Sequence, residues 1–122
     1  MSLAEYESES QIPPELFKDN LVFIRFYANN CRPCEMIEPI YRSIAETRVE
    51  TFLNMEINTF VDLADDMEVG DVPTIVAVYD GYMVAEAVGV FDEDALQGWV
   101  NRIKDYLDKT IKAAQTPIET EV

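Results

Sequence analysis

The chain has 122 residues, of which 48% are apolar and 27% are charged, a balance typical of a folded domain rather than a disordered chain. Its formal net charge is −15, which argues against nucleic acid or an anionic membrane as a partner. There is no histidine, so histidine-assisted nucleophiles and histidine metal ligands are excluded. The acidity favours a partner with a basic surface, although a merely solvated acidic surface is the simpler interpretation.

Residues 1–11 are polar and acidic, and we expect them to be flexible. They lack the basic segment and apolar core of a secretory signal, so the predicted location is the cytoplasm. The folded domain is expected to span residues 12–114, and a second flexible segment is predicted at 115–122. The sequence contains no run of 18 apolar residues, so no membrane span is expected.

Apolar patterning predicts one short helical turn, four strands and three helices along the chain. The first strands alternate with helices, so we expect them to be parallel, and the Asp80-Gly81 turn predicts a hairpin that closes the sheet. The fold class is therefore α/β, with a central mixed sheet of four to five strands flanked by helices. In chain order the elements are a short helical turn at 12–19, a strand at 21–27, a helix from 33, a strand at 51–57, a helix at 60–67, strands at 74–79 and 82–88, and a helix from 92.

The only two cysteines, Cys31 and Cys34, stand where the first long strand gives way to its helix. Sites form at this carboxyl end of the strands in an open α/β sheet. The spacing alone leaves three interpretations: a redox couple, half of a zinc site shared between two chains, or two inert buried thiols.

The position of the pair favours redox chemistry. Unpaired N–H groups and the dipole at a helix N-terminus stabilise a thiolate on Cys31, and the thiolate is the form that attacks a disulfide. Cys34 lies one turn further along, close enough to close a ring with Cys31. Pro33 suits the first helical turn, and Arg32 adds a nearby cation. The arrangement predicts a nucleophile, Cys31, and a resolving thiol, Cys34.

The segment FYANNCRPCEMIEP at residues 26–39 resembles the active-site segment of thioredoxins, whose pattern is FWAxWCGPCKxxxP. The match continues at DVPTIVAVYDG, residues 71–81, which is similar to the Gly-Ile/Val-Pro-Thr segment of that family and its following strand. The element order agrees as well, and the resemblance covers roughly residues 14–112. It implies the thioredoxin fold.

The resemblance also implies a substrate groove. Pro73 would follow a cis peptide bond in a loop that faces the cysteines, and the backbone of Val72 would be presented to an extended substrate segment. Gly89 corresponds to the glycine that closes the groove. Without the resemblance, Pro73 would be interpreted as an ordinary proline at the start of a strand.

Four positions depart from the thioredoxin pattern. The buried aspartate of the family falls on Arg25 and its lysine partner on Asn54, so the usual proton acceptor for the resolving thiol is missing. A buried cation needs a partner, and we expect a carboxylate or the active site itself, unless Arg25 reaches an edge of the sheet. The tryptophan before the motif is Asn30, which predicts a weaker contact surface and a narrow client range, and the glycine inside the motif is Arg32.

These observations predict a protein disulfide oxidoreductase that works by thiol–disulfide exchange. The alternative is a non-enzymatic binding or scaffold module with a thioredoxin fold. We expect no metal and no bound cofactor, and we expect reducing equivalents to come from a thioredoxin reductase with NADPH or a related thiol system. The expected partners are disulfide-containing proteins and the reductase, and neither nucleic acid nor membrane. The protein is expected to be a monomer. The predicted site residues are Cys31 and Cys34 as catalytic, Arg25, Arg32, Pro33 and Pro73 as support, and Asn30, Val72, Pro73 and Gly89 as substrate-binding.

Overall fold

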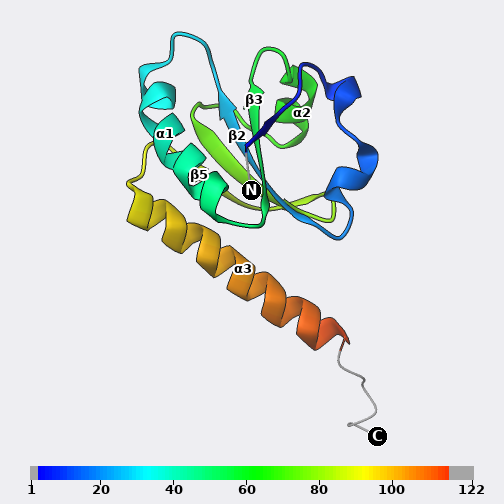
Figure 1. Cartoon of the computed structure of the whole chain (residues 1–122). Coiled ribbons are helices and arrows are strands. Elements are labelled where there is room, and N and C mark those ends of the chain that lie inside the picture. The colour runs from blue at the N-terminus through cyan, green and yellow to red at the C-terminus, as the bar shows by residue number, and fades with distance from the viewer. Residues whose placement is uncertain (1–2, 116–122) are drawn as a thin grey trace, which may run out of the picture.

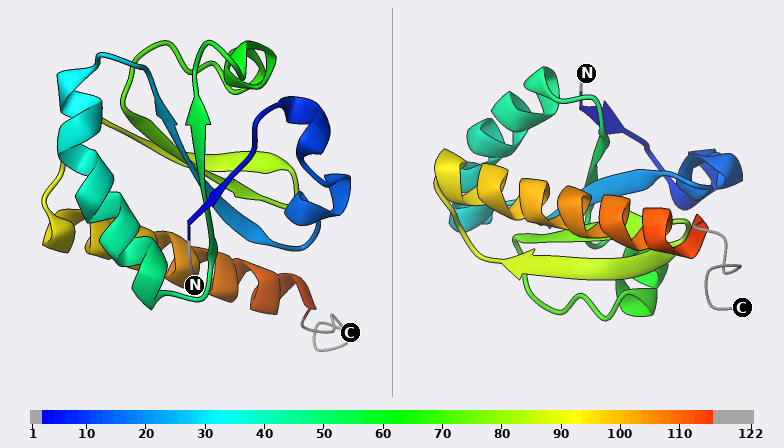
Figure 2. Two further views of the ribbon diagram at one scale, coloured as in Figure 1. Left: turned by 45° about the horizontal axis from the view of Figure 1, so that its top comes forward. Right: turned by 90° about the horizontal axis from the view of Figure 1, so that it is seen from below.

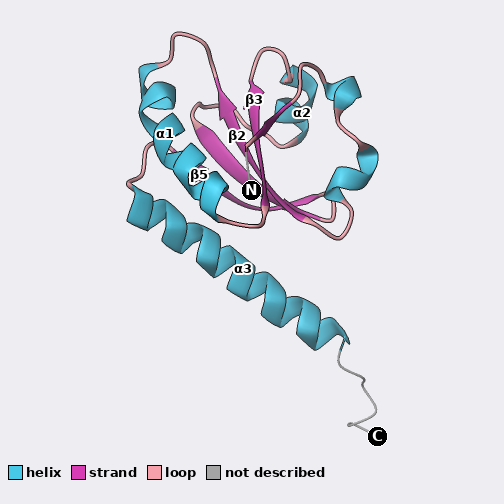
Figure 3. Cartoon of the chain, in the orientation of Figure 1, coloured by secondary structure: helices cyan, strands magenta, loops and turns pink. Residues whose placement is uncertain are grey.

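The computed structural model describes residues 3–115, with side chains to Ile111, and within them the strands form one mixed sheet (Figures 1 and 3). The predicted α/β class is confirmed. The order across the sheet is β1-β3-β2-β4-β5. The strands are β1 (Ala4–Glu5), β2 (Leu21–Tyr27), β3 (Thr51–Glu56), β4 (Thr74–Tyr79) and β5 (Tyr82–Val88). The helices are α1 (Arg32–Thr47), α2 (Val61–Asp66) and α3 (Glu93–Gln115), with 3-10 turns η1 (Glu9–Gln11) and η2 (Pro14–Phe17).

Helices cover both faces of the sheet (Figure 2). α1 and α3 lie on one face, and α2 with the two 3-10 turns lies on the other. The central strand β2 is therefore buried on both sides, which explains its nearly continuous apolar sequence. Phe23 belongs to the core beneath α1 and α3, whereas its neighbour Ile24 belongs to the opposite core.

The direction of β4 differs from the expected parallel one. β4 runs antiparallel to β2, and Thr74 at its start pairs with Phe26 near the end of β2. The preceding helix α2 has six residues, about 9 Å, so it is too short to carry the chain back along a strand of about 20 Å. The chain therefore enters β4 at the end of the sheet where β3 finished. Parallel pairing holds between β2 and β3, and between β1 and β3.

Residues 4–11 contain regular structure that the sequence did not predict. β1 pairs in parallel with β3, with Ala4 opposite Leu53 and Glu5 opposite Asn54. Ala4 and Tyr6 of this segment pack against the core beneath α2, and the expected flexibility of residues 1–11 stays a prediction. The predicted tail at 115–122 lies outside the described residues apart from its first residue, which ends α3, and the domain boundary near residue 114 stays a prediction.

The long helix α3 is amphipathic. Its buried side chains recur at helical spacing and face the sheet. Trp99 is partly buried and packs edge-on against Phe23 of the core, with ring centroids 5.7 Å apart. Within residues 3–115, no helix is both long and apolar enough to cross a membrane. The buried stripe consists of Leu96, Val100, Ile103 and Leu107.

Candidate active site

Cys31 and Cys34 lie at the start of α1, directly after the carboxyl end of β2. The short turn between them and the strand includes Asn30, whose φ of +59° is a left-handed conformation that asparagine tolerates better than most residues. Cys31 then occupies the N-cap position of α1, and its Sγ accepts a hydrogen bond from the backbone N–H of Cys34 at 3.2 Å. The predicted place of Cys31, just before the helix, is confirmed.

The two sulfur atoms are bonded to each other, with the Cα atoms 5.2 Å apart, so the structure represents the oxidised pair. The two cysteines differ in exposure. Cys34 is 2% exposed, whereas Cys31 is partly exposed. Arg32 and Pro33, which lie between them, are both exposed. An incoming reagent therefore meets Cys31 first.

Arg25 lies in β2 beneath the start of α1 and is only 4% exposed. Its Nε donates to Oδ1 of Asn54 at 2.8 Å, and its Nη1 donates to the carbonyl of Cys34 at 3.3 Å. Asn54 in turn donates from Nδ2 to Oε2 of Glu5 at 3.3 Å. The active site was one of the two partners expected for this cation, and the bond to Cys34 confirms it. Among the described residues no carboxylate bonds Arg25 directly: Glu5 is connected to it through Asn54, and Glu38 acts on its charge without a hydrogen bond.

The alternative that Arg25 reaches an edge of the sheet is wrong, because β2 is the central strand. The guanidinium instead stacks over aromatic rings, with its carbon 4.7 Å from the ring centroid of Tyr27 and 5.9 Å from that of Tyr41. Burial lowers the pKa of Arg25, and nearby Tyr41 and Glu38 oppose that shift. An arginine remains charged at neutral pH despite such a shift. The site therefore contains a buried positive charge.

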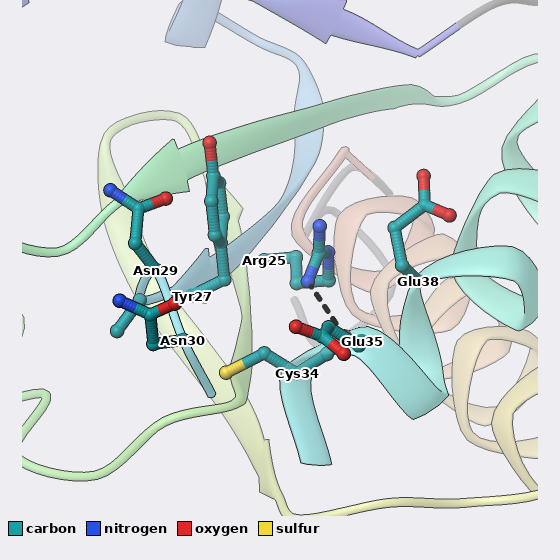
Figure 4. Close-up of a pocket in the computed structure, with 8 residues that line it drawn as sticks. Arg25, Tyr27, Asn29, Asn30, Cys34, Glu35 and Glu38 are labelled. Atoms are coloured by element: carbon teal, nitrogen blue, oxygen red, sulfur yellow. Dashed lines mark hydrogen bonds between the residues drawn. The ribbon is translucent and has the colours of Figure 1, made fainter. Parts of the chain in front are cut away.

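A cleft of about 310 Å³ opens beside the pair (Figure 4). Arg25 and Cys34 both line it, together with Tyr27. Glu35 and Glu38 project from α1 on the same side, so the cleft contains a cation and two carboxylates. Glu38 is paired with Arg42, whose Nη2 lies 2.6 Å from its Oε2.

The predicted groove residues come together at one end of the sheet. The Val72–Pro73 peptide bond is cis, as the resemblance implied. The carbonyl of Pro73 accepts a hydrogen bond from the backbone N–H of Gly89 at 3.0 Å. Pro73 directly precedes Thr74, which pairs with Phe26 near the carboxyl end of β2. Pro73 and Gly89 therefore lie at the end of the sheet that carries the cysteines. Asn30 is exposed and lines the cleft beside Cys34.

Glu5 was not predicted as part of the site, because it lies in the segment expected to be flexible, and Tyr27 was not predicted either. Glu35 and Glu38 were expected only to disfavour a thiolate at the cysteine pair through their charge, and the structure places both at the cleft. The one available signal for Glu5 was chemical: a buried arginine requires acceptors. Within residues 3–115, no group of three or more histidine, cysteine, aspartate or glutamate side chains is arranged to hold a metal ion.

A cysteine pair placed in this way, at the N-cap of the helix that follows the central strand, exchanges its disulfide with those of other molecules. The sheet and the cysteine pair together define this protein as a thiol–disulfide oxidoreductase with a thioredoxin fold.

Comparison with known proteins identifies the family. Residues 4–102 match the family model described as Thioredoxin. Thioredoxin-1 of Saccharomyces cerevisiae is 30% identical over 88 residues, which are 71% of this chain and 85% of that protein. The thioredoxin of Chlamydia trachomatis is 35% identical over 77 residues, 62% of this chain and 76% of that one. The solved structure of a mutant thioredoxin from Halobacterium salinarum superposes with a TM-score of 0.73 and is 31% identical, covering 83% of this chain and 89% of its own. The chain belongs to the thioredoxin family.

Proposed function

We propose that this oxidoreductase acts on protein disulfides, with Cys31 as the attacking thiol and Cys34 as the resolving thiol. The observation that supports this order is the difference in exposure at the N-terminus of α1: Cys34 is 2% exposed and Cys31 is partly exposed. A protein substrate cannot approach a sulfur that is buried, whereas a thiolate at the N-cap is both accessible and stabilised by the helix.

The exchange then takes two steps. In the first step, the thiolate of Cys31 attacks one sulfur of the substrate disulfide, and the other sulfur leaves as a thiolate. In the second step, the thiolate of Cys34 attacks Sγ of Cys31, which releases the reduced substrate and leaves Cys31 bonded to Cys34. Each cycle therefore leaves the protein oxidised.

Regeneration of the dithiol needs two electrons from another protein. We assign that role to a thioredoxin reductase with NADPH, or to a related thiol system, so that the chain carries electrons without a bound cofactor. The cytoplasm, where such systems keep thiols reduced, is the proposed location. The proposed form is a monomer that engages neither nucleic acid nor membrane.

The proposed substrate groove consists of Asn30, Val72, Pro73 and Gly89. The hydrogen bond between Gly89 and Pro73 and the position of both at the end of β2 support this assignment. An extended substrate segment would lie along Val72 beside Cys31. Asn30 offers a polar contact where the family has tryptophan, which favours a restricted set of substrates.

A turnover assay tests the activity. Reduction of insulin disulfides with dithiothreitol as electron donor is expected to accelerate with the protein, and Cys31→Ser is expected to abolish the acceleration. Unchanged turnover in that variant would overturn the assignment of Cys31. Substrates themselves can be captured with Cys34→Ser, which is expected to stop at the mixed disulfide on Cys31. The double variant Cys31→Ser/Cys34→Ser is the matched control and should capture none.

A further inference from the structure

Three polar side chains lie abreast on three neighbouring strands. The register places Glu5 of β1 opposite Asn54 of β3, and Asn54 opposite Arg25 of β2. Hydrogen bonds connect them in the same order, and a further bond connects Arg25 to the carbonyl of Cys34. One polar row thus joins the N-terminal strand to the buried cysteine of the pair.

The arrangement requires an explanation, because an ionised arginine in a sheet interior is costly. Arg25 is 4% exposed, and among the described residues no carboxylate forms a direct salt bridge with it. Its two hydrogen-bond acceptors are an amide oxygen and a backbone carbonyl, both neutral. The positive charge is thus incompletely neutralised in the oxidised protein, and it lies against Cys34.

We propose that Arg25 is a positioning residue for Cys34, one that fixes its backbone and stabilises its thiolate in the resolving step. Glu5, which reaches Arg25 through Asn54, limits the stabilisation by placing a negative charge behind the cation. The inference rests on the proposed role of Cys34 as resolving thiol.

The resolving step shows where the charge matters. Cys34 first loses its proton to solvent, and its thiolate then attacks Sγ of Cys31. A bond forms between the two cysteine sulfurs as the bond from Cys31 to the substrate sulfur breaks. The electron pair leaves on the substrate sulfur, which takes up a proton from solvent. Only the thiolate of Cys34 is competent, so a cation that favours it accelerates the step at neutral pH.

Other groups around Cys34 act on the same thiolate. The carboxylates that project from α1 into the cleft disfavour it, and burial of the sulfur disfavours it as well. The cation Arg32 is exposed to solvent, where its effect is weakened. The titratable groups that line the cleft with Cys34 are Arg25 and Tyr27 from β2 and Glu35 and Glu38 from α1. Cys31 and Arg32 are its neighbours at the start of α1, and Tyr41, Glu38, Tyr27 and Glu5 act on the charge of Arg25.

Two substitutions that should shift the titration of Cys34 in opposite directions test the proposal. Cys31→Ser leaves Cys34 as the only thiol, and its ionisation is followed by the ultraviolet absorbance of the thiolate, measured against the Cys31→Ser/Cys34→Ser protein at each pH. In that background, Arg25→Leu is expected to raise the titration midpoint of Cys34 by about one pH unit. Glu5→Gln keeps the acceptor for Asn54 and removes the charge, so it is expected to lower the midpoint by a smaller amount.

A matched control and a second variant keep the outcome decisive. Glu5 and Glu7 are both exposed, but of the two only Glu5 is hydrogen-bonded to Asn54 among the described residues, so Glu7→Gln removes an equal charge without touching the polar row and is expected to leave the midpoint unchanged. If Arg25→Leu fails to fold, Asn54→Asp provides the same test, since a carboxylate beside Arg25 neutralises it and should raise the midpoint. Midpoints that move in one direction in Arg25→Leu and Glu5→Gln, or do not move, would overturn the proposal. A merely structural role would loosen the site in both variants and could not give shifts of opposite sign.

The rate of the resolving step provides a second readout in the protein with both cysteines. With 4,4′-dithiodipyridine, an uncharged disulfide, the first thiopyridone is released by attack on the probe and the second by closure of the protein disulfide. Arg25→Leu is expected to slow the second release about threefold at neutral pH, since a less acidic thiol is scarcer as thiolate but more nucleophilic. If Cys34→Ser abolished the first release, the order of attack would be wrong, whatever the titration showed.

Discussion

Cys31 and Cys34 have the same side chain in different surroundings, and their reactivity is expected to differ accordingly. In the reduced protein, iodoacetamide should modify Cys31 first, because Cys31 is partly exposed at the N-cap whereas Cys34 is 2% exposed. The rate should rise with pH through a midpoint below that of free cysteine, about 8.5. Peptide mapping after brief labelling at several pH values measures both. Initial modification of Cys34, or a midpoint near that of free cysteine, would contradict the proposed mechanism.

The charge of Arg32 is expected to raise the reduction potential of the Cys31–Cys34 couple above the value it would have with a neutral residue at position 32. A cation beside Cys31 stabilises the thiolate and hence the reduced state. Because Arg32 is exposed, its attraction is that of charges in water, about 1 kcal/mol at contact, or about 20 mV for a two-electron couple. Arg32→Gln should therefore lower the potential by up to this amount in a glutathione equilibrium.

The control for that measurement is Arg102→Gln, an equal change of charge on an exposed side chain of α3. It is expected to leave the potential unchanged. A potential that rises in Arg32→Gln, or that moves equally in both variants, would show that proximity to Cys31 is not the cause.

At the scale of elements, patterns within a short stretch of sequence were enough to predict most of the fold. The apolar run of β2 and the helical spacing in α1 each specify their element locally. The hairpin was predictable from Asp80-Gly81, whose φ angles of 52° and 85° are the left-handed ones that a tight turn between these strands requires. In contrast, β1 is a strand of two residues, which is too short to show any periodicity.

The same distinction applies to the site. Cys31, Cys34 and Pro73 were identified from motifs contained in a few consecutive residues. For Arg25, the active site was expected as a partner and the thioredoxin pattern set Asn54 opposite it, but Glu5 was not identified, because its place depends on the register between strands far apart in the sequence. A polar residue at position 5 has no distinguishing pattern around it. Only the pairing of β1, β3 and β2 brings Glu5, Asn54 and Arg25 into one row.

The loop after α1 contains an ion pair that is expected to stabilise the fold, and its arginine is also hydrogen-bonded to α3. Arg48 binds the carboxylate of Glu50 at 2.9 and 3.1 Å, and its Nη1 also donates to Gln97 and Asn101 of α3. Burial alone would raise the pKa of Glu50, but the hydrogen bonds and the charge of Arg48 outweigh burial and lower it below its ordinary 4.5. We expect Glu50→Gln to reduce the free energy of unfolding at pH 7 by about 1–2 kcal/mol.

The pH dependence of that loss follows from the direction of the shift. A carboxylate whose pKa is depressed on folding contributes stability that is complete above its unfolded pKa and is lost as the pH falls through its folded pKa. Urea unfolding of the unsubstituted protein and of Glu50→Gln should therefore give a difference in unfolding free energy that is constant from pH 7 down to pH 6. The difference should shrink below pH 4.5. Asp105→Asn at an exposed position of α3 is a comparison with the same change of charge. A difference that persisted unchanged in acid would exclude the ion pair as its source.

At the scale of the whole molecule, the formal charge of −15 is expected to select substrates before the site does. An acidic protein attracts a basic one over distances that salt limits to about 8–10 Å at physiological ionic strength. Such steering changes the association rate by a factor of ten or more at low salt. The oxidoreductase should therefore reduce a basic disulfide protein faster than an acidic one whose disulfide has a comparable potential.

The dependence on salt distinguishes steering from preference within the groove. Reduction of the basic substrate should slow steeply as sodium chloride is added, because its attraction to the charged surface is screened. Reduction of the acidic substrate should accelerate, because screening weakens repulsion. Hydroxyethyl disulfide, which is small and uncharged, is expected to show neither trend and serves as the control for effects of salt on the cysteines themselves. Second-order rates at low substrate concentration, measured from low to high salt, give the three slopes. If all three were equal, the surface charge would have no part in selecting substrates, and any preference would have to arise at Asn30, Val72 and the other residues of the groove.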